Sequence, residues 1–156
     1  MWFSGAIIVA LVAGTGAYAH VTGTSDARTV ATLRAVATTF NSDYAANRVG
    51  AVYDRFDAAS RAVISRTDYV RRHRECPDPP GAARVTGVSP SGGFWLVHYE
   101  ISGVVMTDYW HYVAGRWLFS LVKSNPAAVA LYRLPFAAYA RALGCTVLGH
   151  GRGART

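Results

Sequence analysis

The chain has 156 residues, of which 51% are hydrophobic and only 16% charged. That composition fits one folded domain with a real core and excludes disorder over most of the length. Sixteen basic and nine acidic residues give a net charge of +7, and Lys123 is the sole lysine. The arginines do not alternate with aromatic residues along one face, as a surface for single-stranded nucleic acid requires. We therefore expect no nucleic-acid partner.

The first 21 residues contain no Asp, Glu, Lys or Arg, with His20 as the one side chain that can take up a proton, and they are long enough to cross a bilayer core as a helix. The same stretch ends in Ala17-Tyr18-Ala19, a small-residue pattern typical of signal cleavage. The missing basic residue near the start and the long apolar run favour an uncleaved anchor. The sequence thus predicts a membrane contact through residues 2–21 and a domain outside the cytoplasm. Secretion after cleavage at Ala19 is the alternative.

The two cysteines, Cys76 and Cys145, fit an exported protein. Outside the cytoplasm two cysteines most often pair, so we predict a disulfide between them, with two buried free thiols as the alternative. Neither cysteine has a second cysteine or a histidine pair at the spacing of metal ligands. No metal site is expected, and no motif indicates a cofactor.

Hydrophobic spacing predicts helices in the first half of a domain that covers residues 29–145. A polar linker, residues 22–28, precedes it, with Ser25 or Asp26 as the candidate N-cap of a helix over 30–44. A second helix is expected from Asn47, and a third from Ser65 to Cys76. The tail, residues 146–156, has no apolar face and is predicted to be disordered.

From Ala83 the hydrophobic period changes to two, which predicts four antiparallel strands over 83–89, 94–101, 104–113 and 116–122. Tight turns are expected at Ser102-Gly103 and Ala114-Gly115. Asn125-Pro126 begins one short helix, and Pro135 begins another that runs to Gly144. The fold class is therefore α+β: an N-terminal hydrophobic helix, then helices packed on a four-stranded antiparallel sheet, then short C-terminal helices.

These turns set a register that places Asp108 opposite Val97 and Leu121, on the strongly apolar face of the sheet. Asp108 is the only acid on that face, which the helices are expected to cover. The candidate pocket-lining residues all lie there: Trp95, Tyr99, Met106, Asp108, Trp110, Tyr112, Trp117 and Phe119. The opposite face carries His98, Glu100 and His111, a candidate surface for an envelope protein or for self-association.

This order of elements resembles the nuclear transport factor 2-like superfamily. The stretch from Tyr53 to Cys76, with Ser60-Arg61, Ile64-Ser65 and Tyr69-Val70, is similar to the second and third helices of exported bacterial members, including the membrane-proximal domain of penicillin-binding proteins. The resemblance covers about residues 29–121. It implies a curved sheet that wraps around the helices and leaves a cone-shaped cavity. In enzymes of this fold an acid or a histidine projects from the sheet into that cavity, and Asp108 matches this placement.

A buried carboxylate without a partner costs several kcal/mol, so we expect Asp108 to accept hydrogen bonds from a Tyr, a Trp or an arginine such as Arg34 or Arg55. Catalysis needs a second polar group at the same place, and the register offers only Tyr99, Tyr112 and tryptophan N–H groups. The sequence therefore favours a membrane-anchored extracytoplasmic binding or accessory module without catalysis. The alternative is an isomerase- or cyclase-like enzyme that uses Asp108. A filled cone favours the module, and an open cavity of a few hundred Å³ reaching Asp108 favours the enzyme.

Overall fold

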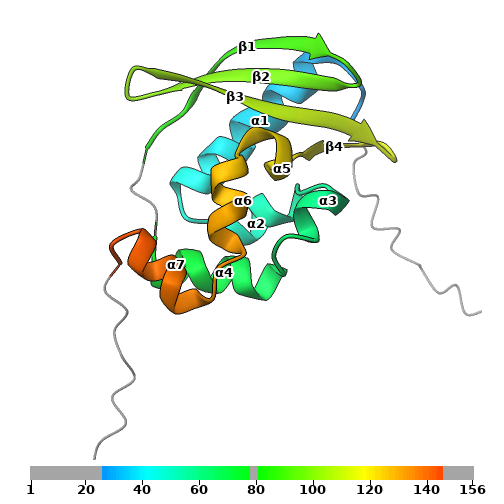
Figure 1. Ribbon diagram of the computed structural model, residues 1–156. Coiled ribbons are helices and arrows are strands. Elements are labelled where there is room, and N and C mark those ends of the chain that lie inside the picture. The colour runs from blue at the N-terminus through cyan, green and yellow to red at the C-terminus, as the bar shows by residue number, and fades with distance from the viewer. Residues whose placement is uncertain (1–25, 78–80, 146–156) are drawn as a thin grey trace, which may run out of the picture.

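The computed structural model describes residues 26–77 and 81–145 and shows an α+β fold. Four antiparallel strands form a sheet in the order β1-β2-β3-β4, which does not close on itself, and Figure 1 shows the helices gathered on one side of it. The elements are α1 (Val30–Ala45), α2 (Val49–Asp54), α3 (Ala58–Arg61), α4 (Arg66–Glu75), β1 (Arg84–Ser91), β2 (Phe94–Ile101), β3 (Val104–Val113), β4 (Arg116–Phe119), α5 (Leu121–Ser124), α6 (Pro126–Tyr132) and α7 (Phe136–Ala142).

The start of α1 differs from the prediction. Its N-cap is Thr29, whose hydroxyl accepts a hydrogen bond from the Thr32 amide at 3.1 Å. A capping side chain must directly precede the first helical residue to reach the third amide, and Asp26 lies too far upstream. Asp26 instead accepts a hydrogen bond from Arg55 at 2.6 Å, while Ser25 is outside the described residues.

Two other helix starts are confirmed. Ser65 accepts a hydrogen bond from the Asp68 amide at 3.1 Å and begins α4. Asn125 accepts one from the Ala128 amide at 2.9 Å, with Pro126 at the first helical position of α6. Asn47, predicted to begin the second helix, has a φ of 54° and lies in the turn before α2.

The predicted register of the sheet is confirmed between β2 and β3, where Val97 pairs with Asp108 and Tyr99 with Met106. The turn residues Ala114 and Gly115 both have positive φ, 48° and 78°, the conformation of a tight two-residue hairpin turn. Side chains therefore alternate as the pattern predicts, and Asp108 points to the helix side.

The fourth strand is shorter than predicted, because it ends at Phe119 and the chain turns into α5. Phe119 is held from the side: its amide donates to the Arg55 carbonyl at 2.7 Å, and its carbonyl accepts from the Asp57 amide at 2.9 Å. The Leu121 amide then donates to the Ser60 hydroxyl at 2.9 Å. The predicted pairing of Leu121 with Asp108 is therefore wrong.

The disulfide between Cys76 and Cys145 is confirmed, with their Cα atoms 5.7 Å apart. It joins the end of α4 to the chain just beyond α7, across 69 residues of sequence. In the loop-entropy model a closed loop of this length stabilises a fold by about 4 kcal/mol. The bond ties together the ends of α4 and α7, which lie next to each other at the end of the domain away from the sheet (Figure 1).

The helices cover the aromatic face of the sheet, where Trp110 and Trp117 are completely buried. None of the helices within residues 26–77 and 81–145 has the length and apolar character of a membrane span. The predicted anchor, residues 1–21, and the predicted disordered tail, residues 146–156, lie outside the described residues, as does most of the linker.

Candidate functional site

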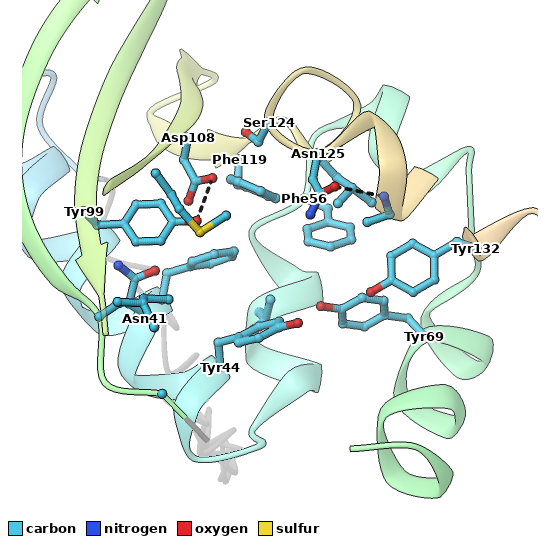
Figure 2. Close-up of a pocket in the computed structure, with 18 residues that line it drawn as sticks. Asn41, Tyr44, Phe56, Tyr69, Tyr99, Asp108, Phe119, Ser124, Asn125 and Tyr132 are labelled. Carbon is cyan, nitrogen blue, oxygen red and sulfur yellow. Dashed lines mark hydrogen bonds between the residues drawn. The ribbon is translucent and has the colours of Figure 1, made fainter. Parts of the chain in front are cut away.

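A cavity of about 260 Å³ lies between the inner face of the sheet and the helices. Figure 2 shows Asp108 and Tyr99 at one end of it, and Tyr44, Tyr69 and Tyr132 at the other. The lining residues come from both halves of the chain: Phe40, Asn41, Tyr44, Val52, Phe56, Tyr69, Gly81, Ala83, Tyr99, Ile101, Met106, Asp108, Phe119, Leu121, Ser124, Asn125, Ala128 and Tyr132. Met106 and Tyr44 are about two-fifths exposed, which places the mouth beside them.

Strand β3 delivers Asp108 to this cavity. The side chain lies on the inner face because Asp108 pairs with Val97 across the β2–β3 ladder, and it is only 7% exposed. The Tyr99 hydroxyl donates a hydrogen bond to it at 3.4 Å. That distance is long for a bond to a carboxylate, which is usually below 2.8 Å, so the compensation is weak.

Burial controls the ionisation of this pair. Loss of solvent raises the pKa of Asp108 to about 7, and the hydrogen bond from Tyr99 only partly opposes that shift. Burial also raises the pKa of Tyr99, and the neighbouring carboxylate adds to the effect. Near neutral pH, Asp108 therefore exists in both protonation states, and Tyr99 remains a neutral hydrogen-bond donor.

Of the partners predicted for Asp108, a tyrosine is confirmed in Tyr99, whereas the two arginines given as examples bind elsewhere. Arg34 donates to the carbonyl of Val85 at 3.1 Å, where β1 has a bulge. Arg55 forms an ion pair with Asp26 at 2.6 Å. Both arginines therefore bind partners that are distant from them in the sequence and that only folding brings close.

Asn41 adds a polar group to the cavity wall. It is 8% exposed, and its amide nitrogen has no hydrogen-bond partner within the described residues. Two further polar lining residues are already engaged: the Ser124 hydroxyl accepts from the Tyr109 amide at 2.8 Å, and the Asn125 carbonyl oxygen caps α6. The free donor of Asn41 is available to a bound molecule.

Aromatic rings form a continuous belt along the cavity. Phe119 packs against Phe40 and Phe56, with ring centroids 4.8 and 5.7 Å apart. Phe56 contacts Tyr69 at 5.1 Å, and Tyr69 contacts Tyr132 at 5.5 Å. These five residues come from β4, α1, α4, α6 and the segment after α2, so the belt exists only in the folded chain.

The sequence-predicted pocket residues separate into two groups. Four of them line the cavity: Tyr99, Met106, Asp108 and Phe119. The other four do not: Trp95, Trp110, Tyr112 and Trp117. Two of these four residues contact the segment just before α1 instead. The Trp117 indole donates to the Ala27 carbonyl at 3.2 Å, and the Tyr112 hydroxyl donates to the Asp26 carbonyl.

Sequence reasoning missed most of the helical wall. Asn41, Tyr69, Ser124, Asn125 and Tyr132 line the cavity without having been identified as site residues. The four-residue spacing of Phe40 and Tyr44 was a visible signal for one aromatic helix face. Nothing local in the sequence shows that α6 faces the same space as β3.

The polar face of the sheet has local partners for its candidate residues. His98 bonds the Thr107 hydroxyl at 2.9 Å, and Glu100 pairs with Arg84 at 2.8 Å. His111 lies 3.4 Å from a carboxylate oxygen of Asp57. In the described part of the chain, no three His, Cys, Asp or Glu residues cluster as metal ligands.

The cavity and its carboxylate are thus the features of the structure best suited to hold a ligand. Comparison with known proteins finds no matching family model, no matching curated protein and no matching solved structure.

Proposed function

We propose that this chain is an extracytoplasmic binding module whose cavity holds a small, mostly apolar molecule beside Asp108. An open cavity of about 260 Å³ that reaches Asp108 is what the enzyme alternative predicts, so the proposal rests on the lining of the cavity: most of its residues are apolar, and Tyr99 alone among the described residues is hydrogen-bonded to Asp108. Binding sites for small molecules have this composition, and their polar groups set the orientation of the ligand. Asp108 and the free amide of Asn41 are the groups that serve this purpose here.

The disulfide supports a location outside the cytoplasm. Bonds such as Cys76–Cys145 persist in oxidising compartments and are rare where cellular thiols keep cysteines reduced. Residues 1–21 are the proposed membrane anchor, with cleavage after Ala19 as the alternative. The polar sheet face with His98 and His111 is the proposed surface for an envelope protein or a second copy.

A nuclear transport factor 2-like fold, with a curved sheet and a cone-shaped cavity, is proposed as the architecture. It is supported by the element order, with helices before the sheet, and by a cavity between the helices and the inner sheet face. In this fold the cavity is where ligands or substrates are held, in agreement with the proposed site.

Binding of a neutral apolar probe tests the proposal. Indole is added to the purified full chain, and binding is followed by calorimetry and by NMR shifts of cavity residues. Ala128→Phe fills the cavity from α6 and should abolish binding, whereas Ala130→Phe, on the exposed side of the same helix, should leave it unchanged. Binding that survives Ala128→Phe, or shifts confined to residues outside the cavity, would contradict the proposal.

The second candidate is an enzyme that transfers protons through Asp108. The open cavity and a pKa near 7 favour it, since a base that titrates near the working pH is efficient. Tyr99 is the only other group hydrogen-bonded to this carboxylate in the described residues, which favours binding over catalysis. Deuterium exchange from heavy water into a bound ketone probe, lost in Asp108→Asn, would establish the enzyme instead.

A further inference from the structure

Asp108 differs from the other acids of the described chain in having no basic partner. Every other acid within residues 26–77 and 81–145 has an Arg or His nitrogen within 3.5 Å of a carboxylate oxygen. The pairs are Asp26–Arg55, Asp43–Arg48, Asp54–Arg66, Asp57–His111, Asp68–Arg71, Glu75–Arg74 and Glu100–Arg84. The chain has a net charge of +7, yet none of the arginines within residues 26–77 and 81–145 lines the cavity.

The cavity is also rich in the other group that attracts cations. Seven of the lining residues are aromatic: Phe40, Tyr44, Phe56, Tyr69, Tyr99, Phe119 and Tyr132. The face of an aromatic ring is electronegative, so a cation held against several such faces is attracted to them. Among the residues that the structure describes, the cavity has one carboxylate, seven aromatic rings and no basic side chain, which are the electrostatics of a cation site.

We propose that the cavity takes an organic cation, an amine or quaternary ammonium group on an apolar body, with the positive group beside Asp108 and against the aromatic rings. This inference rests on the proposed binding function and names the class of its ligand. The ligand supplies the positive charge that no described side chain places beside Asp108. Its apolar body fills the space between β3 and α6 (Figure 2).

The protonation of Asp108 gives the inference a pH signature. A cation binds the ionised carboxylate, so its affinity should rise with pH until Asp108 is fully ionised. A neutral ligand that accepts a hydrogen bond from protonated Asp108 should show the opposite slope. The other titratable groups among the described lining residues are phenols: Tyr99 from β2 lies beside Asp108, and Tyr44 from α1, Tyr69 from α4 and Tyr132 from α6 lie at the opposite end. An ordinary phenol stays neutral at pH 5–8.

Two ligands of the same shape separate charge from size. Benzyltrimethylammonium carries a permanent positive charge, and neopentylbenzene replaces its nitrogen with carbon. Calorimetry of the full chain at pH 8 should show the cation binding roughly 30-fold more tightly, the ratio that corresponds to about 2 kcal/mol. Because neither ligand titrates, any pH dependence belongs to the protein. Cation affinity should fall about tenfold per pH unit below pH 7.

Variants assign the effect to the cavity. Asp108→Asn should reduce cation affinity at pH 8 at least tenfold and remove its pH dependence. The variant keeps the buried His73, which contacts the hydroxyl of the lining residue Tyr132, so the loss of pH dependence would belong to Asp108 and not to this histidine. The matched control is Asp54→Asn, which makes the same chemical change at an exposed acid outside the cavity and should change neither. Phe119→Leu, at the end of the cavity that holds Asp108, should weaken the cation several-fold and leave neopentylbenzene within about twofold.

The outcomes distinguish this inference from the function on which it rests. If both ligands bind equally tightly and Ala128→Phe abolishes both, the binding function stands and the cation inference fails. Cation binding that is unchanged in a folded Asp108→Asn protein also overturns the inference. If neither ligand nor indole binds at millimolar concentration, both proposals fail.

Discussion

Replacing Asp108 with asparagine should stabilise the protein at pH 8. The folded-state pKa of Asp108 is about 7, against an ordinary value of 3.8. Between these values the folded state keeps the proton and the unfolded state loses it, so stability falls as pH rises from about 4 to 7 and is constant above. The difference between the two pKa values of Asp108 corresponds to about 4 kcal/mol in the free energy of unfolding. This value is an upper limit, because water that enters the cavity solvates the carboxylate and reduces the cost of its burial. Asparagine has nearly the same shape and stays neutral, so the variant does not lose stability as the pH rises.

Urea denaturation of the full chain, followed by tryptophan fluorescence, measures the effect. At pH 8 the Asp108→Asn protein should unfold with a free energy higher by up to about 4 kcal/mol, and near pH 4 the two proteins should coincide. The wild-type stability should decline with pH across this window, apart from changes that the variant shares. An Asp108→Asn protein that is less stable than wild type at pH 8 would show that the carboxylate has a compensating partner, contrary to this account.

Three further predictions concern the stability of the fold and the cellular location of the protein. Cys76→Ser should lower the free energy of unfolding by about 2–4 kcal/mol in urea, and a reducing agent should have the same effect on wild type but none on the variant. Ser65→Ala should cost about 1 kcal/mol in the same assay, because the Asp68 amide loses its cap; an unchanged midpoint would contradict that role. The full chain should stay in the membrane fraction at alkaline pH with residues 1–21 retained, whereas a soluble chain that begins at His20 would demonstrate cleavage.

The strand register was predictable because it depends on local signals. Ala114-Gly115 forms the kind of turn that joins adjacent strands without a bulge, and the alternation of Trp110 and Tyr112 with polar residues fixes which face is buried. The helix starts at Ser65 and Asn125 are local for the same reason. The disulfide followed from the inferred compartment and the cysteine count.

What the sequence did not reveal depends on contacts between distant segments. Strand β4 ends at Phe119 because Arg55 and Asp57 bond its backbone, and no periodicity in residues 116–122 reports this contact. Of the donors considered for Asp108, the sequence could not select Tyr99 over Arg55, because Arg55 pairs with Asp26, 29 positions away in sequence. The helical half of the cavity wall was missed because it requires the packing of α1 and α6 against one sheet face.

The most direct test of the central claim is the ionisation of Asp108, measured from its carboxyl carbon-13 shift against pH in the full chain. The account predicts an apparent pKa of about 7 in the free protein and a clear decrease when benzyltrimethylammonium is bound, because the cation favours the carboxylate. A pKa near 3.8 in the free protein, or one that the cation leaves unchanged, would contradict it.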